Sequence, residues 1–439
     1  MTNLNRRQFM VMGGVGAATL AGSMTLTAAS AKSPSPDHGP GTRGYVAPGI
    51  NDPDSAGRKH MALVTTDGWV SMPRDSDPVS PWFPDVLAPG DTNTFVFGFR
   101  NVTGLSRDQA EAQRGVVQIS APFVHVQAGQ ELWLTMSNLG LSMRPDLVDS
   151  HTVHWHGFRN AIPFYDGVPE SSISVNIGRD FTYVFKPTDP GTYMYHCHFE
   201  DVEHVTMGMT GIVFVTPADG SKTVYGLGPT VIDSTTGATI TIPDGTYARE
   251  YAILLTEMDS RAHFGDAHIQ PTDWTDFAPN FWLMNGRAYP DTIAPNGEDG
   301  VHNDGTPVAA AGFGHLAHQP MSSRIVCAPG ERVLVRLANL GFQEQSLTLP
   351  GIPMTIVGKD ARPLTTDEVE ITDTIQIGPG ESRDVIIVAP AKVGQYPLFN
   401  RDMAKYPGSS ITGDQFHGGQ RTVVDVQAAL PAQTEVNGW

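Results

Sequence analysis

Short runs of alternating apolar and polar residues recur along most of the chain and predict half-buried β-strands. Two clear examples are residues 94–99, Thr-Phe-Val-Phe-Gly-Phe, and residues 131–136, Glu-Leu-Trp-Leu-Thr-Met. In a strand, side chains two positions apart point to the same face of the sheet. The 46 glycines and 34 prolines among 439 residues separate such runs and mark turns between them. The pattern therefore predicts an all-β fold of many short strands.

The second half of the chain repeats the first. Residues 127–140 are similar to residues 328–341, and both stretches end in Asn-Leu-Gly; further on, residues 191–196 are similar to residues 394–399. Two matches in the same order predict two cupredoxin-like Greek-key β-sandwiches. We expect a signal peptide at 1–31, an extended lead-in at 32–60, a first sandwich at 61–217, a linker at 218–247, a second sandwich at 248–428 and a tail at 429–439.

The N-terminal segment has the features of an export signal. Arg6 and Arg7 precede a weakly apolar run rich in glycine and alanine, which ends in a small-x-small pattern at residues 29–31. This arrangement resembles a twin-arginine signal peptide. The run is short and interrupted by glycines, and no later apolar stretch is long enough to span a bilayer. We therefore expect an exported protein, periplasmic or extracellular, without a membrane span.

The charge and the cysteine content narrow the functional classes. The net charge is −18, and lysine and arginine form no cluster beyond the N-terminus, which argues against a nucleic acid partner. Two cysteines, Cys197 and Cys327, cannot form a disulfide framework. Cys327 lies in an apolar run and is expected to be a buried structural thiol. Cys197 stands between histidines, which favours a ligand role.

Two histidine clusters stand in the first half. One is the motif His-x-x-His-x-His-Gly at residues 151–157, and the other is His-Cys-His at residues 196–198. On a strand, the two histidines that flank Cys197 point to one face while Cys197 points to the other. One strand can therefore serve two metal sites, one on each face. Single histidines are more often core or surface residues, but clusters this dense predict metal binding.

The donor types indicate the metal. A thiolate, two imidazoles and a weak thioether suit a trigonal copper site with a long axial methionine. A structural zinc site would use paired Cys-x-x-Cys ligands, which the sequence lacks. Cys197 and His204 fit two of the copper positions, joined by His151 from the upstream cluster. Met209 is the expected axial ligand and Met207 is its rival.

These two motifs resemble the signature motifs of the multicopper oxidases, the laccase-like family, and the resemblance extends over both sandwiches. It implies copper as the cofactor, with the type 1 ligands His151, Cys197, His204 and Met209, the type 2 ligand His154, and the type 3 ligands His156, His196 and His198. The segment between Cys197 and His204 is two residues longer than the usual spacing of the family.

Asp166 follows the first motif in the loop 160–169. The resemblance implies that this carboxylate hands protons to the oxygen-reducing cluster. An aspartate before a glycine is also common in turns for conformational reasons alone. Both interpretations of Asp166 stay open.

The second sandwich departs from the family pattern. A trinuclear cluster needs eight histidines, four from each of two domains, and two-domain members take the second four from a neighbouring subunit of a trimer. The internal repeat places Gln345, Thr348, Pro350, Phe399, Asn400 and Arg401 at the corresponding positions. We therefore expect a second sandwich without copper and half a cluster in each chain. The other histidines of this half are expected to be solvent-facing loop residues: His263, His268, His302, His315, His318 and His417.

The favoured function is a laccase-like oxidoreductase, expected as a homotrimer, that passes electrons from a small-molecule or metal-ion reductant to oxygen. One alternative is a copper nitrite reductase-like enzyme, in which His315 or His318 completes the type 2 site of a neighbouring subunit. His198 argues against it, because nitrite reductases carry a non-ligand residue there. A second alternative is a blue-copper electron-transfer protein that is not an enzyme. The sequence does not mark the reductant.

Overall fold

The structure is a computed structural model, and it describes residues 57–73, 81–159, 161–226, 228, 230–232, 237–297, 309–402, 405, 419–433 and 437. The expected signal peptide, most of the lead-in, His302 and His417 lie outside these residues.

The first half of the described chain forms a sandwich of two four-stranded sheets. One sheet has the order β2-β1-β4-β6 and the other the order β3-β8-β7-β5. The strands are β1 (Lys59–Ser71), β2 (Asn93–Asn101), β3 (Val124–Gln127), β4 (Leu132–Asn138), β5 (His154–His156), β6 (Asp180–Phe185), β7 (Gly191–His196) and β8 (Thr210–Thr216). Strand β4 alternates strictly between buried and half-buried residues, which is the pattern that predicted it.

The second half repeats this architecture. One sheet has the order β12-β11-β14-β20-β16-β17, with β18 paired to β16, and the other the order β13-β22-β21-β15-β19. The strands are β11 (Arg249–Met258), β12 (Phe281–Met284), β13 (Ile325–Cys327), β14 (Arg332–Asn339), β15 (Gln345–Thr348), β16 (Met354–Lys359), β17 (Arg362–Pro363), β18 (Glu370–Thr372), β19 (Thr374–Ile377), β20 (Ser382–Val388), β21 (Gly394–Asn400) and β22 (Arg421–Val426). The predicted all-β fold class is confirmed.

The strand register supports the alignment of the two halves. His154 lies opposite His196 across β5 and β7, and Thr348 lies opposite Phe399 across β15 and β21. The sequence repeat had equated Thr348 with His154 and Phe399 with His196. The parallel pair β1–β4 likewise has its counterpart in β11–β14. The two sandwiches are therefore copies down to the pairing of individual residues.

Several connections carry short helices or turns, and the connection from β12 to β13 runs from residue 285 to residue 324. The hairpin of β9 (Thr230–Ile232) and β10 (Thr239–Thr241) lies between the two sandwiches. The described α-helices are α2 (Arg107–Glu111), α3 (Asp201–Met207) and α4 (Ser260–Ala267), and the 3-10 turns are η1 (Pro163–Tyr165), η2 (Trp274–Asp276), η3 (Asp291–Ile293), η4 (Gly314–Leu316) and η5 (Thr366–Glu368). Among the described helices, none has the length and apolar character to cross a membrane.

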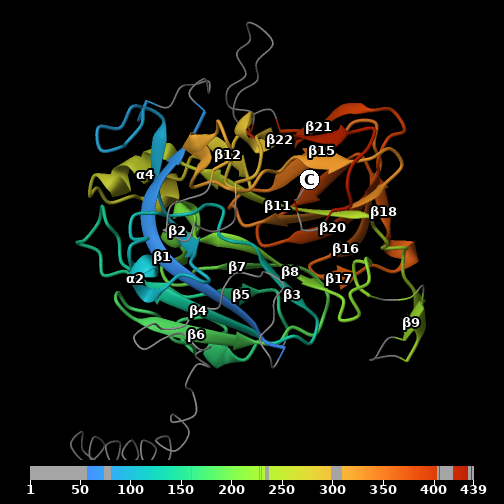
Figure 1. The fold of residues 1–439 in the computed structure, drawn as a ribbon, viewed down its shortest axis with the longest axis horizontal. Coiled ribbons are helices and arrows are strands. Elements are labelled where there is room, and N and C mark those ends of the chain that lie inside the picture. Colours follow the sequence, from blue (N-terminus) through green and yellow to red (C-terminus); the bar gives the residue numbers. More distant parts are fainter. Residues whose placement is uncertain are drawn as a thin grey trace, which may run out of the picture.

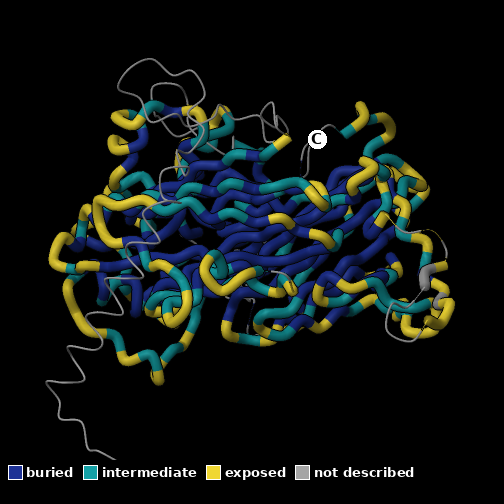
Figure 2. The backbone as a smooth tube through the Cα atoms, turned by 90° about the horizontal axis from the view of Figure 1, so that it is seen from below, coloured by how far each residue is buried: buried dark blue, intermediate teal, exposed yellow. Residues whose placement is uncertain are grey.

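The two sandwiches pack face against face, with β7 and β8 of the first against β11, β14 and β20 of the second (Figure 1). Side chains alternate along β7. Tyr193 and Tyr195 point into the core of the first sandwich, whereas Met194 packs against Ala252 and Leu254 of the second. Buried backbone gathers in the middle of the molecule, and the exposed stretches lie mostly at its periphery (Figure 2). Strand β7 therefore has one face in its own core and one at the contact between the sandwiches.

Candidate metal centre

Three predicted type 1 ligands converge inside the first sandwich. The Cys197 Sγ atom lies 3.2 Å from His204 Nδ1 and 3.9 Å from His151 Nδ1, and the two Nδ1 atoms lie 3.4 Å apart. An ion about 2 Å from each of three donors requires donor–donor separations of roughly 3.5 Å. All three residues are buried. A thiolate and two imidazoles at this spacing fit a trigonal copper site.

Local backbone structure sets this arrangement. Strand β7 ends at His196, so Cys197 is the first residue beyond it. The Cys197 amide donates to the Met209 carbonyl at 3.1 Å, and the Thr152 amide donates to Cys197 Sγ at 3.4 Å. The two additional residues of the loop are accommodated because the chain turns into α3, and this helix brings His204 back to Cys197. Backbone pairing thus holds the thiol on both sides.

The pairing of β7 with β8 distinguishes the two methionines. His196 lies opposite Thr210, and the backbone bond of Cys197 to Met209 continues this register by one residue. Directly opposed residues of antiparallel strands share a face, so Met209 lies on the side of Cys197. Met207 is the last residue of α3 and is equally buried.

The pKa values of the two imidazole donors, His151 and His204, are shifted in opposite directions. Burial lowers the pKa of His151 well below its ordinary value, and the neighbouring His204 adds to this effect. Burial also lowers the pKa of His204, but the charges of the Cys197 thiolate and the Asp149 carboxylate raise it to about 10. Metal binding at His204 therefore displaces a proton.

A second group of histidines lies on the other face of β7. The ring centroid of His154 is 5.1 Å from that of His196 and 5.1 Å from that of His198. One donor atom each of His154, His156 and His196 lie within 4.8 Å of one another. Burial lowers the pKa of all three, and that of His196 to about 3. These imidazoles are therefore neutral near pH 7, which is the form that binds metals.

The half cluster opens toward the second sandwich of the same chain. A cavity of about 410 Å³ is lined by His156 and Tyr193 from the first sandwich and by Lys359, Asp360 and Gly380 from the second, among others. A Cβ atom added to Gly380 would lie 3.2 Å from His156 Cε1. Among the described residues that line this cavity, the second sandwich contributes no histidine. The described residues around this cavity therefore bring a histidine of the first sandwich against non-histidine side chains of the second.

Asp166 contacts the half cluster in two ways. The His154 Nδ1 group donates to the Asp166 carbonyl at 2.7 Å, and the Asp166 carboxylate lies 3.5 Å from the same nitrogen. This contact leaves His154 Nε2 for a metal. Burial raises the pKa of Asp166, and the nearby His198 lowers it. Asp166 also caps the turn η1, and Gly167, with φ +74°, passes so close to the Val153 carbonyl that a Cβ atom does not fit. The structure therefore shows a turn residue that also reaches the cluster.

In the second sandwich, amide side chains stand at two positions that correspond to predicted type 1 ligands of the first. Asn400 Nδ2 donates to Gln345 Oε1 and to Gln420 Oε1, both at 2.8 Å. Gln345 Nε2 donates to Glu257 Oε2 at 3.1 Å. Each of these buried groups has a polar partner, which removes most of the cost of burying it. The repeat predicted Gln345 and Asn400; it gave no signal for Glu257 or Gln420, which come from other strands and loops.

Two histidines of the second half do not face the solvent, contrary to expectation. His263 on α4 is buried and its Nδ1 lies 2.5 Å from the Phe95 carbonyl. His318 Nδ1 lies 2.7 Å from the Val117 carbonyl and is mostly covered. Both carbonyls belong to the first sandwich, so the packing of the two sandwiches buries these side chains. His315 is exposed as expected and its Nε2 lies 3.1 Å from Asp291 Oδ1.

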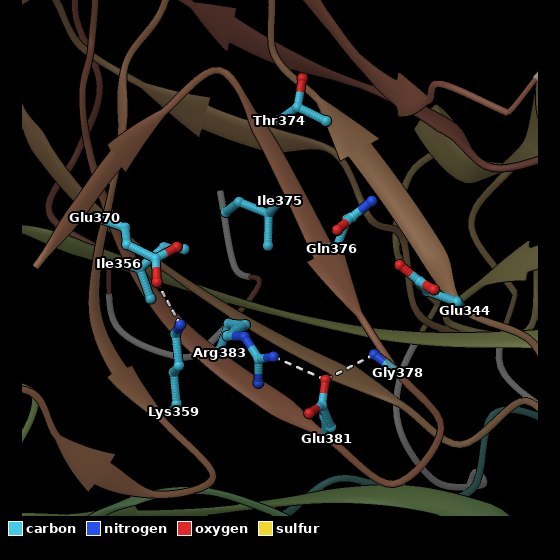
Figure 3. Close-up of a pocket in the computed structure, with 10 residues that line it drawn as sticks. All are labelled: Glu344, Ile356, Lys359, Glu370, Thr374, Ile375, Gln376, Gly378, Glu381 and Arg383. Atoms are coloured by element: carbon cyan, nitrogen blue, oxygen red, sulfur yellow. Dashed lines mark hydrogen bonds and ion pairs between the residues drawn. The ribbon is translucent and has the colours of Figure 1, made fainter. Parts of the chain in front are cut away.

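A larger cavity, of about 480 Å³, lies elsewhere on the second sandwich, among β16, β18, β19 and β20 (Figure 3). Four of its charged side chains form two pairs: Lys359 Nζ lies 2.5 Å from Glu370 Oε1, and an Arg383 nitrogen lies 2.7 Å from Glu381 Oε2. None of the predicted copper ligands lines it. We therefore do not assign the chemistry to this cavity.

The chain is similar to known copper proteins. Two sequence profiles, both described as multicopper oxidase, match residues 108–220 and 261–427. A multicopper oxidase of Mycobacterium tuberculosis is 28% identical over 289 residues, which cover 64% of this chain and 48% of that protein. The chain thus spans about half the length of this relative.

Solved structures share the fold. The blue copper oxidase from Nitrosomonas europaea superposes with a TM-score of 0.55 at 22% identity, over 84% of this chain and 86% of that one. The copper nitrite reductase from the same organism gives a TM-score of 0.52 at 17% identity, over 84% and 93% of the two chains. At these identities the likeness concerns the fold alone. The two profile matches together cover well over half of the sequence, and the chain belongs to the multicopper oxidase family.

Proposed function

We propose that this protein is a laccase-like copper oxidoreductase that takes electrons from a reductant and passes them to dioxygen. The observation that carries the proposal is the placement of two donor groups back to back at the end of β7. Cys197 belongs to one group, and its chain neighbours His196 and His198 belong to the other. Three consecutive residues therefore join the two groups by covalent bonds.

The copper that these residues would hold supplies one-electron chemistry, which side chains alone lack. We assign His151, Cys197, His204 and Met209 to type 1 copper, and His154, His156, His196 and His198 to half of a type 2/type 3 cluster. The chain itself contributes neutral imidazoles in a cleft between its two sandwiches. Asp166 holds the His154 ring through its carbonyl, and its carboxylate is the group best placed to carry protons to that histidine.

Assembly and location complete the proposal. We infer a homotrimer, because the half cluster lies at β5, an edge strand of its sheet, where a neighbouring subunit could meet it. The proposal also includes an export signal at 1–31. It divides the rest of the chain into a first sandwich at 61–217, a linker at 218–247 and a second sandwich at 248–428. A copper resistance protein of Pseudomonas syringae and several laccases are among the relatives.

The copper content of the purified protein with its subunit count tests this function. We expect more than one copper per chain, together with oxygen uptake when a phenolic or metal-ion reductant is added. One copper per chain with blue colour and no oxygen uptake would contradict the proposal and favour an electron-transfer protein.

The alternative function, a nitrite reductase, is tested by a separate assay. Reduced viologen and nitrite would then yield nitric oxide, and replacing the ligand from the neighbouring subunit would abolish it. Both histidines considered for that role have a partner in their own chain, but His315 is exposed whereas His318 is mostly covered. The His315→Ala variant is therefore the informative one, with His318→Ala as a test of folding.

A further inference from the structure

Helix α4 belongs to the second half of the chain but lies against the first sandwich. It follows β11 after a single residue, and its buried side chains include His263 and Ala267. Ala267 is part of the hydrophobic core of the first sandwich, which also contains Cys197. Helix α4 contacts β2, and so does α3, the helix that carries His204. An element from the other half of the sequence therefore borders the type 1 donors.

The outer edge of β2 is where the two helices meet the first sandwich. Strand β2 is at the end of its sheet, so every second residue directs its backbone groups away from β1. The Phe95 carbonyl accepts a hydrogen bond from His263 Nδ1 at 2.5 Å. Two residues further, the Phe97 carbonyl lies so close to Gly208 that a Cβ atom there would be 2.9 Å away. The side chain of His263 and the turn that ends α3 therefore cover neighbouring positions of this edge.

His263 acts on α3 as well as on β2. The side chain is 0% exposed. Burial lowers its pKa to about 4, whereas the Phe95 carbonyl, the Asp259 carboxylate and the Thr206 carbonyl raise it. The ring is therefore neutral near pH 7 and carries one N–H group, which Phe95 holds. Thr206 is a buried residue of α3, two positions after His204. One buried ring thus interacts with the backbone of both elements.

A second residue of α4 holds the segment that leads to His151. Arg144 Nη1 donates to the backbone carbonyl and to the carboxylate of Asp266, both at 2.7 Å. Arg144 and Asp266 are both buried, and the chain runs from Arg144 to His151 within seven residues. Helix α4 therefore contacts both segments that bring imidazole donors to the type 1 site, which are α3 and the loop 144–150.

We propose that His263 is a positioning residue of the type 1 site: it holds α3 at the edge of β2 and so fixes His204 relative to Cys197. The inference rests on the type 1 assignment in the proposed function and adds a residue outside the donor set. The properties of a trigonal copper site depend on its donor geometry, and side chains that orient the ligands contribute to it. The spectrum of type 1 copper should therefore respond to a side chain that does not touch the metal.

Hydrogen–deuterium exchange of the copper-free protein tests the contact without the metal. In His263→Phe, which keeps a ring but has no donor, the amides of residues 204–209 should exchange about tenfold faster. The matched control is His318→Phe, because His318 Nδ1 also bonds to a carbonyl of the first sandwich, that of Val117 at 2.7 Å. This control should leave the exchange of residues 204–209 unchanged. Equal exchange rates in the two variants would overturn the proposal.

Visible and electron paramagnetic resonance spectra of the copper-loaded protein test the positioning role. The blue band and the copper hyperfine splitting should shift in His263→Phe and stay unchanged in His318→Phe. His263→Asn should restore the original spectra, because asparagine Nδ2 takes the place of Nδ1 and donates to Phe95. If His263→Phe does not fold, His263→Gln replaces it, since the longer side chain displaces the amide by one bond. Unshifted spectra in a folded variant without the donor would contradict the role, even if that variant is less stable.

The same variants separate this inference from the oxidase function. If the unaltered protein is blue and takes up oxygen but the spectra are indifferent to His263, the positioning role is wrong and the oxidase function stands. If the spectra depend on His263 but no reductant supports oxygen uptake, the positioning role stands and the oxidase function is wrong.

Discussion

At the scale of single residues, the chain carries two cysteines with opposite environments. Cys197 lies within 4 Å of two imidazole nitrogens. Cys327 is in the core of the second sandwich, where burial raises its pKa to about 12. A thiol with a raised pKa stays protonated and is a poor metal ligand. Proximity to histidines, rather than burial, therefore distinguishes the ligand from the structural thiol.

Replacing each cysteine tests this distinction. Cys197→Ser should abolish the blue absorbance and the oxygen uptake, because a hydroxyl does not replace the thiolate. Cys327→Ser should keep both at close to the original level. Visible spectroscopy with copper analysis measures the difference. Loss of colour in both variants, with folded protein by circular dichroism, would argue against the assignment.

Glu257 gives a prediction for pH. Burial raises its pKa to about 7, against the hydrogen bonds that it accepts from Phe342, Gln343 and Gln345. The folded state then holds the proton more tightly than the unfolded state, so stability is greatest below the ordinary pKa near 4.5 and falls as the pH rises toward 7. The free energy of unfolding should decrease by about 1–3 kcal/mol over this range.

Thermal unfolding at pH 5 and pH 7.5 measures this effect. In Glu257→Gln, the decrease of Tm between these pH values should be smaller than in the unaltered protein, because glutamine does not titrate. The pKa of Asp266 is also raised to about 7. The contribution of Glu257 is therefore isolated only by comparing the variant with the unaltered protein. An unchanged decrease in the variant would show that Glu257 is not the group responsible.

At the scale of elements, α3 and the residues that follow it hold the type 1 donors in place. Gly208 ends the helix with φ +122°, and a Cβ atom there would lie 2.9 Å from the Phe97 carbonyl and 2.8 Å from Ile119 Cγ2. Its neighbours Met207 and Met209 are both fully buried. The backbone of this turn therefore determines which methionine faces Cys197.

We expect Gly208→Ala to destabilise the protein by about 1–3 kcal/mol and to weaken the blue absorbance, since strand β8 must shift. Gly220, which has φ +69° and open space around it, provides a control at a positive φ without the steric contacts. Gly220→Ala should lower stability but leave the spectrum unchanged. Denaturant unfolding and visible spectra together give both readouts.

The methionines can be separated in the same way. Met209→Leu should shift the visible and electron paramagnetic resonance spectra of type 1 copper and raise its potential, because the weak axial ligand is lost. Met207→Leu should remain spectroscopically unchanged and cost less than about 1.5 kcal/mol. The opposite result would assign the axial position to Met207.

At the scale of the whole molecule, a buried charge network joins the two sandwiches. The Arg336 guanidinium contacts Glu250 and lies 3.1 Å from Asp384 Oδ1. Asp384 also accepts from Thr192 of β7 at 2.5 Å and from Tyr225 at 2.6 Å. Thr192 belongs to the first sandwich, whereas the three charged residues of the network belong to the second. The network therefore fixes how β7, which ends at the proposed copper ligand His196, lies against the second sandwich.

Arg336→Met should destabilise the protein by about 3–5 kcal/mol, because it leaves two buried carboxylates without their cation. Arg332→Met, at a partly exposed ion pair with Asp244, should cost about 0–1 kcal/mol. Denaturant unfolding compares the two variants. Equal effects would mean that the buried network does not stabilise the contact between the sandwiches.

The sequence by itself determined the strands, the duplication and the two donor groups. Alternation of side chains is a local property of a strand, so the opposite faces of Cys197 and its flanking histidines follow from the spacing alone. The alignment of the two halves followed equally from the repeat, and the pairing of Thr348 with Phe399 agrees with it.

Only the tertiary structure decided what surrounds these groups. Asp149 and Glu200 are 51 positions apart and meet at His204 because a loop of the first sandwich packs beside α3. His263 and His318 are covered because the two sandwiches pack together. Glu257 and Gln420 join the amide network from distant segments. Such contacts depend on how separate elements pack, and no period or motif in a single stretch of sequence encodes that packing.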